Sequence, residues 1–216
     1  MNNILKAAKL DFSLVRPYIK SIAFSILFPI VLSVMNRSLL YGISFAMCFI
    51  GVTSGYTFSI SEKNDMERLY SILPISKKHM VIGRYLYTCA MGLFALLISL
   101  AVHPVILLAL GETVKPLDIF AAAMVGIIMF SLFTVFLLPG YYKYGSIKGR
   151  IFRFIPVAGY FAVLIFVPKI DLADNSVLSV ILNDPIILTA VLLSVCIIAF
   201  LLSIIASIRI LQNKKA

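Results

Sequence analysis

The sequence predicts an all-α membrane protein, a single transmembrane domain over residues 1–216 with six transmembrane helices. Hydrophobic residues make up 62% of the chain and charged residues 13%, whereas soluble domains carry about 45–50% and roughly 25%. The mean hydropathy is +1.06, and the basic residues lie between long apolar runs. A soluble fold of this size cannot bury so much apolar surface, so lipid must be its solvent.

An interfacial helix is expected before the first span. Residues 1–20 are basic and place Ile4, Leu5, Ala8 and Phe12 at helical spacing, which is typical of an amphipathic helix at a membrane surface. Six apolar runs follow, each long enough or nearly long enough to cross the hydrocarbon. They cover residues 18–35, 39–60, 80–110, 118–138, 155–168 and 186–210.

Two interruptions are expected within this plan. His103 and Pro104 fall inside the third span, which is long for one crossing, so we expect either a kink there or a helix that begins among the headgroups and tilts. Residues 139–154 are rich in Gly, Tyr and Lys and are interpreted as an interfacial loop.

The distribution of basic residues predicts the orientation. With six spans, sixteen of the nineteen Lys and Arg residues fall on the side that holds both termini. Only Arg37, Lys115 and Lys169 fall on the other side. Because basic residues are retained in cytoplasmic loops, we expect a multi-pass protein of the bacterial cell membrane with both termini in the cytoplasm. This placement also argues against nucleic-acid binding, in which basic residues gather on one solvated face.

Chemistry inside the spans is sparse. Their interiors lack acidic and basic side chains, which ion-coupled transporters usually place near the midplane. His103, near the outer end of its span, is interpreted as a satisfied or interface-facing side chain rather than a proton relay. Any transport must therefore draw its energy from elsewhere.

No catalytic motif is found. The run from Gly140 to Gly145 has the spacing of a phosphate loop but lacks the lysine that follows the second glycine. Metal-ligand sets of membrane proteases are also absent from the sequence. We expect a chain that is no enzyme and holds no metal or cofactor, with ATP and Mg²⁺ bound by a separate partner.

Small residues recur along the second span. Gly51, Gly55 and Ser59 are spaced by four, so they share one helix face and permit close helix packing. An intramolecular groove and the seam of a dimer are equally compatible with this pattern.

A polar loop over residues 61–79 joins the second and third spans. Asn64 and Glu67 have the spacing of a capping box, and Pro74 ends the helix that would follow. Ser76 is placed to cap the next helix. The loop helix would be amphipathic and would either dock on a partner or lie on the membrane as a connector. Its apolar face would carry Met66, Leu69, Tyr70 and Leu73.

The same segment resembles the permease subunits of ATP-binding-cassette type-2 exporters. The resemblance rests on Glu62-Lys63-Asn64-Asp65, Leu69, Leu73-Pro74-Ile75-Ser76-Lys77-Lys78, Val81, Arg84 and Tyr85. The six-span layout extends it to the whole chain. Within that family the chain is most similar to the permeases that export phenol-soluble modulins, which are amphipathic peptide toxins.

The resemblance implies a half-transporter. Two permease chains, identical or paralogous, would pair, and each would rest on a separate ABC ATPase subunit. The loop helix would be the coupling helix that docks on the ATPase. Its residues would be Glu62, Asn64, Asp65, Met66, Glu67, Arg68, Leu69, Leu73 and Pro74.

The function expected from these observations is ATP-driven export of hydrophobic or amphipathic molecules, with peptides foremost. Toxin secretion and antimicrobial resistance are the corresponding biological roles. Candidates to line the path are Phe24, Phe28, Tyr56 and Phe58. The alternative is a non-transporting membrane partner, such as an assembly factor or an immunity protein that sequesters peptide.

Overall fold

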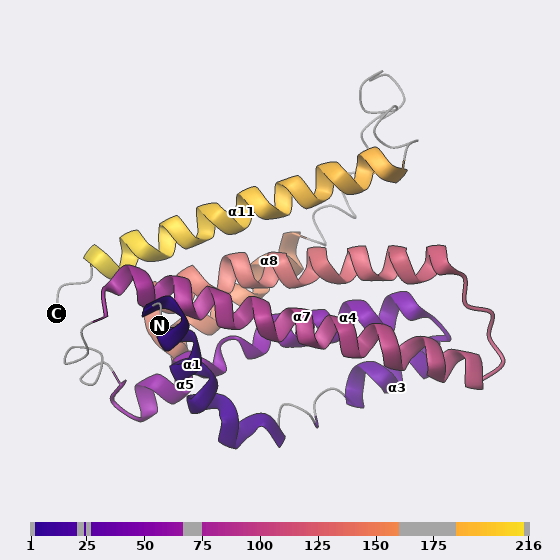
Figure 1. Ribbon diagram of the computed structural model, residues 1–216, viewed down its shortest axis with the longest axis horizontal. Coiled ribbons are helices and arrows are strands. Elements are labelled where there is room, and N and C mark those ends of the chain that lie inside the picture. The colour runs from indigo at the N-terminus through magenta and orange to yellow at the C-terminus, as the bar shows by residue number, and fades with distance from the viewer. Residues whose placement is uncertain (1–2, 21–23, 25–26, 67–74, 160–184, 214–216) are drawn as a thin grey trace.

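The computed structural model describes residues 3–20, 24, 27–66, 75–159 and 185–213, and this part of the chain is helical without any strand (Figure 1). The order of elements is α1 (Asn3–Val15), η1 (Arg16–Tyr18), α3 (Leu27–Asn36), α4 (Leu39–Thr53), α5 (Tyr56–Lys63), α7 (Lys77–Ala109), α8 (Pro116–Lys148), η2 (Gly149–Arg153) and α11 (Pro185–Asn213).

Four segments are long and apolar enough to cross a membrane: Leu39–Lys63, Lys77–Ala109, Pro116–Gly159 and Thr189–Asn213. They overlap the predicted spans at 39–60, 80–110, 118–138 and 186–210, and α7, α8 and α11 run along one another in Figure 1. The predicted first span is only partly described and includes the short apolar helix α3. The predicted fifth span, 155–168, lies mostly outside the described residues, so the count of six stays a prediction.

α7 starts where the sequence predicts it. The Ser76 hydroxyl accepts a hydrogen bond from the backbone N–H of His79 at 3.4 Å, which confirms Ser76 as the N-cap. The helix then continues for 33 residues, including Pro104. The helix is thus continuous through His103 and Pro104, as helices in lipid tolerate an internal proline when their neighbours supply packing. The predicted kink or tilt at this position stays a prediction.

The interpretation of residues 139–154 as a loop is wrong. α8 extends to Lys148 and η2 to Arg153, and the backbone departs from helical geometry at Gly145, where φ is +77°. Tyr141 and Tyr142 are buried against Phe58 at ring-centroid distances of 5.1 and 4.8 Å. Their packing favours helix in a segment whose composition is typical of a loop.

The core is shared by α4, α7 and α8. α4 and α8 lie against each other at Gly51, where an added Cβ would come within 2.9 Å of the Phe133 Cβ. At Gly55, an added Cβ would lie 2.4 Å from the Tyr141 hydroxyl oxygen. Both glycines thus face α8 of the same chain, and Ser59 hydrogen-bonds the Gly55 carbonyl. Of the two alternatives, an intramolecular packing groove and the seam of a dimer, this arrangement matches the groove.

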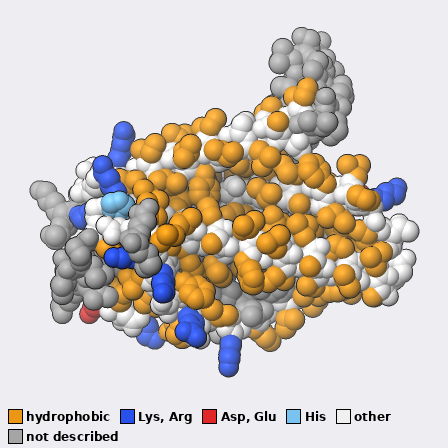
Figure 2. Space-filling view, in the orientation of Figure 1, with side chains coloured by type: hydrophobic (Ala, Val, Ile, Leu, Met, Phe, Trp, Pro, Cys, Tyr) orange, Lys and Arg blue, Asp and Glu red, His pale blue; other side chains and the backbone are white. Residues whose placement is uncertain are grey.

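Charge is concentrated at one end of the bundle. Figure 2 shows basic side chains gathered there and a broad apolar surface along the long helices. We call this the basic end; it comprises α1, α5, the start of α7, residues 143–153 and the end of α11. The opposite end, with the α3–α4 turn, the end of α7 and the start of α8, is called the far end.

Candidate functional site at the basic end

The predicted coupling loop leaves the bundle between α5 and α7. Asn64 ends α5: its backbone N–H bonds the Ile60 carbonyl at 3.1 Å, and Asp65 follows with φ +48°. The expectation that Asn64 begins a helix is therefore wrong. Met66 is buried rather than presented on an open surface. The remaining predicted coupling residues, Glu67, Arg68, Leu69, Leu73 and Pro74, lie outside the described residues.

A buried ion pair joins α1 to α7 beside this loop. The Arg84 guanidinium donates to the Asp11 carboxylate through Nε at 3.1 Å and Nη2 at 3.0 Å. Arg84 is 7% exposed and Asp11 3%. Two parallel bonds match the planar fork of the guanidinium, which gives the pair a fixed geometry.

The same arginine reaches α5, immediately before the loop. Nη2 lies 3.4 Å from the Ser61 hydroxyl, and the guanidinium carbon lies 4.3 Å from the centre of the Phe58 ring. A cation over an aromatic face is attracted by the ring quadrupole. Arg84 thus holds the segment before the loop against the helix that follows it.

A second polar contact joins α5 to α8. The Glu62 carboxylate accepts a hydrogen bond from the Ser146 backbone N–H at 2.7 Å and another from the Ser146 hydroxyl. Ser146 follows Gly145, where the helix direction changes, so Glu62 satisfies a backbone donor that the break would leave unpaired. Glu62, predicted to meet the rim of an ATPase, is already engaged within the chain.

α11 is attached through hydroxyl groups. The Tyr85 hydroxyl lies 2.6 Å from the Ser203 hydroxyl and 2.9 Å from that of Ser207. Ser203 in turn donates to the Val135 carbonyl of α8 at 2.8 Å. At the helix end, Lys77 donates to the Leu211 carbonyl at 3.2 Å. The start of α7 therefore contacts every long helix that ends at the basic end.

The four candidates for the transport path divide into two groups. Phe24, Phe28 and Tyr56 are exposed, and the Phe28 ring contacts Phe49 edge-on with centroids 5.6 Å apart. Phe58 is 6% exposed and packed between Arg84 and the tyrosines of α8. Its ring packs the basic end in the described conformation, and its assignment to the transport path stays a prediction.

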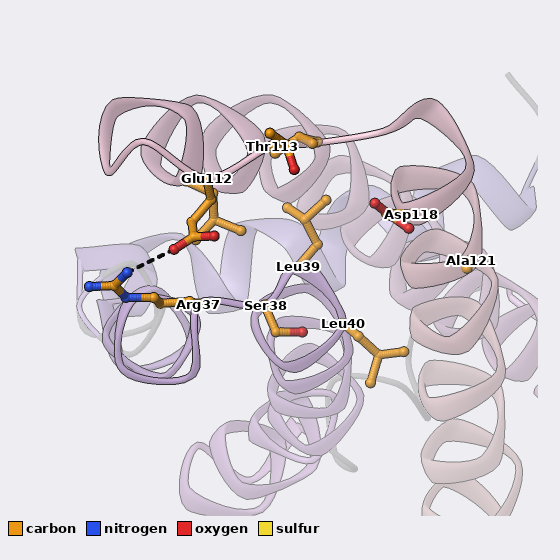
Figure 3. Close-up of a pocket in the computed structure, with 10 residues that line it drawn as sticks. Arg37, Ser38, Leu39, Leu40, Glu112, Thr113, Asp118 and Ala121 are labelled. Atoms are coloured by element: carbon orange, nitrogen blue, oxygen red, sulfur yellow. Dashed lines mark hydrogen bonds and ion pairs between the residues drawn. The ribbon is translucent and has the colours of Figure 1, made fainter.

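A pocket of about 230 Å³ opens at the far end (Figure 3). It is lined by Ser38, Leu39, Leu107 and Asp118 among others, and the Arg37–Glu112 ion pair, 2.9 Å long, bridges its mouth. The pair links the α3–α4 turn to the segment after α7. Both its side chains are substantially exposed, which indicates a weak contact.

His103 lies deep between α3, α4 and α7 and is 1% exposed. Its Nδ1 is 2.9 Å from the Ser99 carbonyl, which can only accept, so Nδ1 carries the proton. Nε2 has no hydrogen-bond partner within the described residues. One of the two ring nitrogens is therefore hydrogen-bonded. Among the described residues, the ring does not belong to a chain of titratable groups, which a proton relay requires.

Sequence reasoning missed the Asp11–Arg84 pair. A signal was present: Asp11 is the only acidic residue of α1 and stands four residues from both Ala7 and Val15, on the face that becomes buried. Arg84 is likewise the basic residue furthest inside the predicted third span. Two isolated opposite charges on apolar faces are costly unless they meet.

Comparison with known families covers nearly the whole chain. The family model described as ABC-2 family transporter protein matches residues 8–212, a range that includes the second half of α1, the predicted coupling loop and nearly all of α11. No curated protein and no solved structure matches the chain. The described residues also hold four helices long and apolar enough to cross a membrane. The extent of the family match shows that this chain belongs to the ABC-2 family of transporter proteins.

Proposed function

We propose that the chain is the permease subunit of an ATP-driven exporter of amphipathic molecules, with peptides as the foremost substrate class. A separate ABC ATPase binds ATP and Mg²⁺ and docks on the loop between α5 and α7. A second permease chain completes the path. The protein lies in the bacterial cell membrane with the basic end and both termini in the cytoplasm, as the charge distribution favours.

One observation supports this proposal most strongly. Both ends of the loop are tied to the bundle, through Ser61 and Glu62 on one side and Arg84 on the other. A displacement of the loop would therefore move α1, α7 and α8, because the residues at both ends of the loop are fixed to these helices. Such a connection is what an external ATPase needs in order to move membrane helices.

The composition supports the substrate class. The described parts of the four long segments present apolar surface, and the far end carries a pocket lined by both apolar and polar residues. Surfaces that combine apolar and polar residues suit a molecule with one apolar and one polar side, and they suit a small ion poorly.

The test is purification of the tagged chain from membranes of its own cells. We expect an ABC ATPase to copurify, and expect ATP hydrolysis by the complex to rise when an amphipathic helical peptide is added. The isolated chain should hydrolyse no ATP. Tight peptide binding by a chain that never associates with an ATPase would instead favour the assembly or immunity role.

A further inference from the structure

The exposed face of α1 carries two parallel stripes of different chemistry. Leu5 and Phe12, seven residues apart and so on one face, are 52% and 45% exposed. Lys9 of α1 and Arg16, the first residue of η1, are also seven apart and form the adjoining stripe, and Lys6 of α1 lies beyond it. Large apolar side chains and cations therefore lie side by side along α1 and the first residue of η1.

The buried face of α1 fixes which residues point outward. Asp11 is held by Arg84, and an added Cβ at Gly83 would lie 2.6 Å from the Cβ of Ala7. The close backbone approach and the two-bond ion pair together prevent rotation of the helix about its axis. The outward stripes are thus a property of the fold.

Because the same ion pair directs Asp11 inward, the outer face of α1 carries only positive charge. Asp11 is the only acid of α1, and its charge is directed inward to Arg84. Among the described residues, Lys6, Lys9 and Arg16 form no ion pair with a carboxylate. Three cations are consequently presented without a neutralising carboxylate in the part of the chain that the structure describes.

α1 lies at one end of the helices that are long and apolar enough to cross a membrane, where lipid headgroups would be expected. In Figure 1 it runs crosswise to α7, α8 and α11 at the end where those helices terminate or begin. A helix with an apolar stripe and a cationic stripe in that position inserts the first among acyl chains and leaves the second level with phosphate groups. A soluble acidic protein would pair with the cations but would leave Leu5 and Phe12 without a suitable partner.

We propose that Lys6, Lys9 and Arg16 form a binding site for the phosphate headgroups of anionic phospholipids, next to the acyl-inserting side chains Leu5 and Phe12. The site lies on the face of α1 opposite to Asp11. It depends on the membrane leaflet at the basic end and requires neither an ATPase nor a transported substrate. It is therefore independent of the function proposed above.

The test compares two lipids on the purified chain in a neutral detergent. Phosphatidylglycerol and phosphatidylcholine are added at equal concentrations, and retained lipid is counted by native mass spectrometry. We expect selective retention of phosphatidylglycerol by the wild type. In the triple variant Lys6→Gln/Lys9→Gln/Arg16→Gln, that selectivity should fall by at least about tenfold, because anionic surfaces attract each nearby cation.

A matched control removes the same charge elsewhere at the basic end. The variant Lys143→Gln/Lys148→Gln/Arg150→Gln loses three exposed cations of α8 and η2 and should keep the wild-type selectivity. If both variants lose selectivity for phosphatidylglycerol equally, the effect depends on net charge alone, and the proposed site is wrong. Unchanged selectivity in the α1 variant would also overturn it, and would turn attention to an acidic protein surface as the partner of these cations.

A second measurement on the wild type removes any dependence on how the variants fold. Because the headgroup contact is electrostatic, phosphatidylglycerol retention should decrease as sodium chloride rises from about 0.05 to about 0.5 M. Phosphatidylcholine retention should stay constant over that range. Retention of both lipids that is insensitive to salt would contradict a phosphate site.

Discussion

Arg84 of α7 and Asp11 of α1 form a bidentate ion pair across 73 positions of sequence, with N–O distances of 3.1 and 3.0 Å. The pair attaches the N-terminal helix to the start of the helix that follows the predicted coupling loop. Since Arg84 also contacts Ser61 and Phe58, one side chain connects three helices at the basic end. The consequences of this connection can be measured.

Removing one partner of the pair should destabilise the protein more than removing both charges. Arg84→Gln leaves the Asp11 carboxylate buried without a counter-charge, a loss of about 3–5 kcal/mol in the free energy of unfolding. The double variant Asp11→Asn/Arg84→Gln leaves no buried charge and should be more stable than Arg84→Gln alone. Thermal unfolding midpoints in detergent measure both effects.

The exposed ion pair at the far end provides the control. The Arg37 side chain is 71% exposed and that of Glu112 is 34% exposed. Arg37→Gln breaks their contact and should lower the free energy of unfolding by about 0–1 kcal/mol. If Arg84→Gln and Arg37→Gln lower the unfolding midpoint equally, the buried pair has no special structural role.

A second prediction concerns the contact between α1 and α7 at Gly83. An added Cβ would lie 2.6 Å from the Ala7 Cβ and 2.9 Å from the Ile4 carbonyl oxygen, and backbone atoms cannot move aside cheaply. We expect Gly83→Ala to cost about 1–3 kcal/mol and to make residues 3–20 more susceptible to protease. Gly159→Ala is the matched control, because an added Cβ there meets no atom within 4 Å. Equal protease susceptibility in the two variants would show that α1 does not depend on this contact.

Local signals indicated the start of α7 and the all-helical character of the chain. The Ser76 cap marks the start of α7, and the four long apolar segments overlap predicted spans, because both signals depend on residues close together in sequence. The long helical extension of α8 could not be predicted in this way. It depends on Tyr141 and Tyr142 packing against Phe58, more than eighty positions earlier.

The candidate site was predicted only in outline. The position of the loop between α5 and α7 follows from hydropathy, but Asn64 ends a helix where its spacing to Glu67 suggested a beginning. The resemblance to exporter permeases places Glu62 in the segment that would contact an ATPase. The actual partner of Glu62, Ser146, is available only because Gly145 breaks α8 at that point. The spacing of residues along the sequence does not predict contacts between distant segments.

Topology can be tested by cysteine labelling of intact cells with a membrane-impermeant maleimide. Single cysteines replace Glu112, at the far end, and Lys148, at the basic end, in a chain without its three native cysteines. We expect labelling at position 112 and none at position 148, because basic residues stay in the cytoplasm. Position 148 should become reactive once the cells are permeabilised. Labelling of position 148 in intact cells would contradict the orientation and the six-span count together.

The last prediction concerns the coupling segment itself. If its apolar side chains fill a groove on an ATPase, Leu69→Ala or Leu73→Ala should release the ATPase or abolish export. Truncation of a buried anchor typically costs above roughly 2 kcal/mol of binding free energy, whereas charges at the rim of an interface contribute less. Copurification of the ATPase and export of an amphipathic peptide are measured in the same strains.

Lys148→Ala is the control for this experiment, since it alters an exposed side chain at the same end of the bundle and should leave both readouts at wild-type levels. A helix that only lies on lipid gives a different result. It would tolerate Leu69→Ala with the complex intact and export normal, because one leucine fewer changes membrane contact by little. That outcome would reduce residues 61–79 to a connector between spans. The rigid attachment at Arg84 and Glu62 would then stabilise the permease without transmitting force from an ATPase.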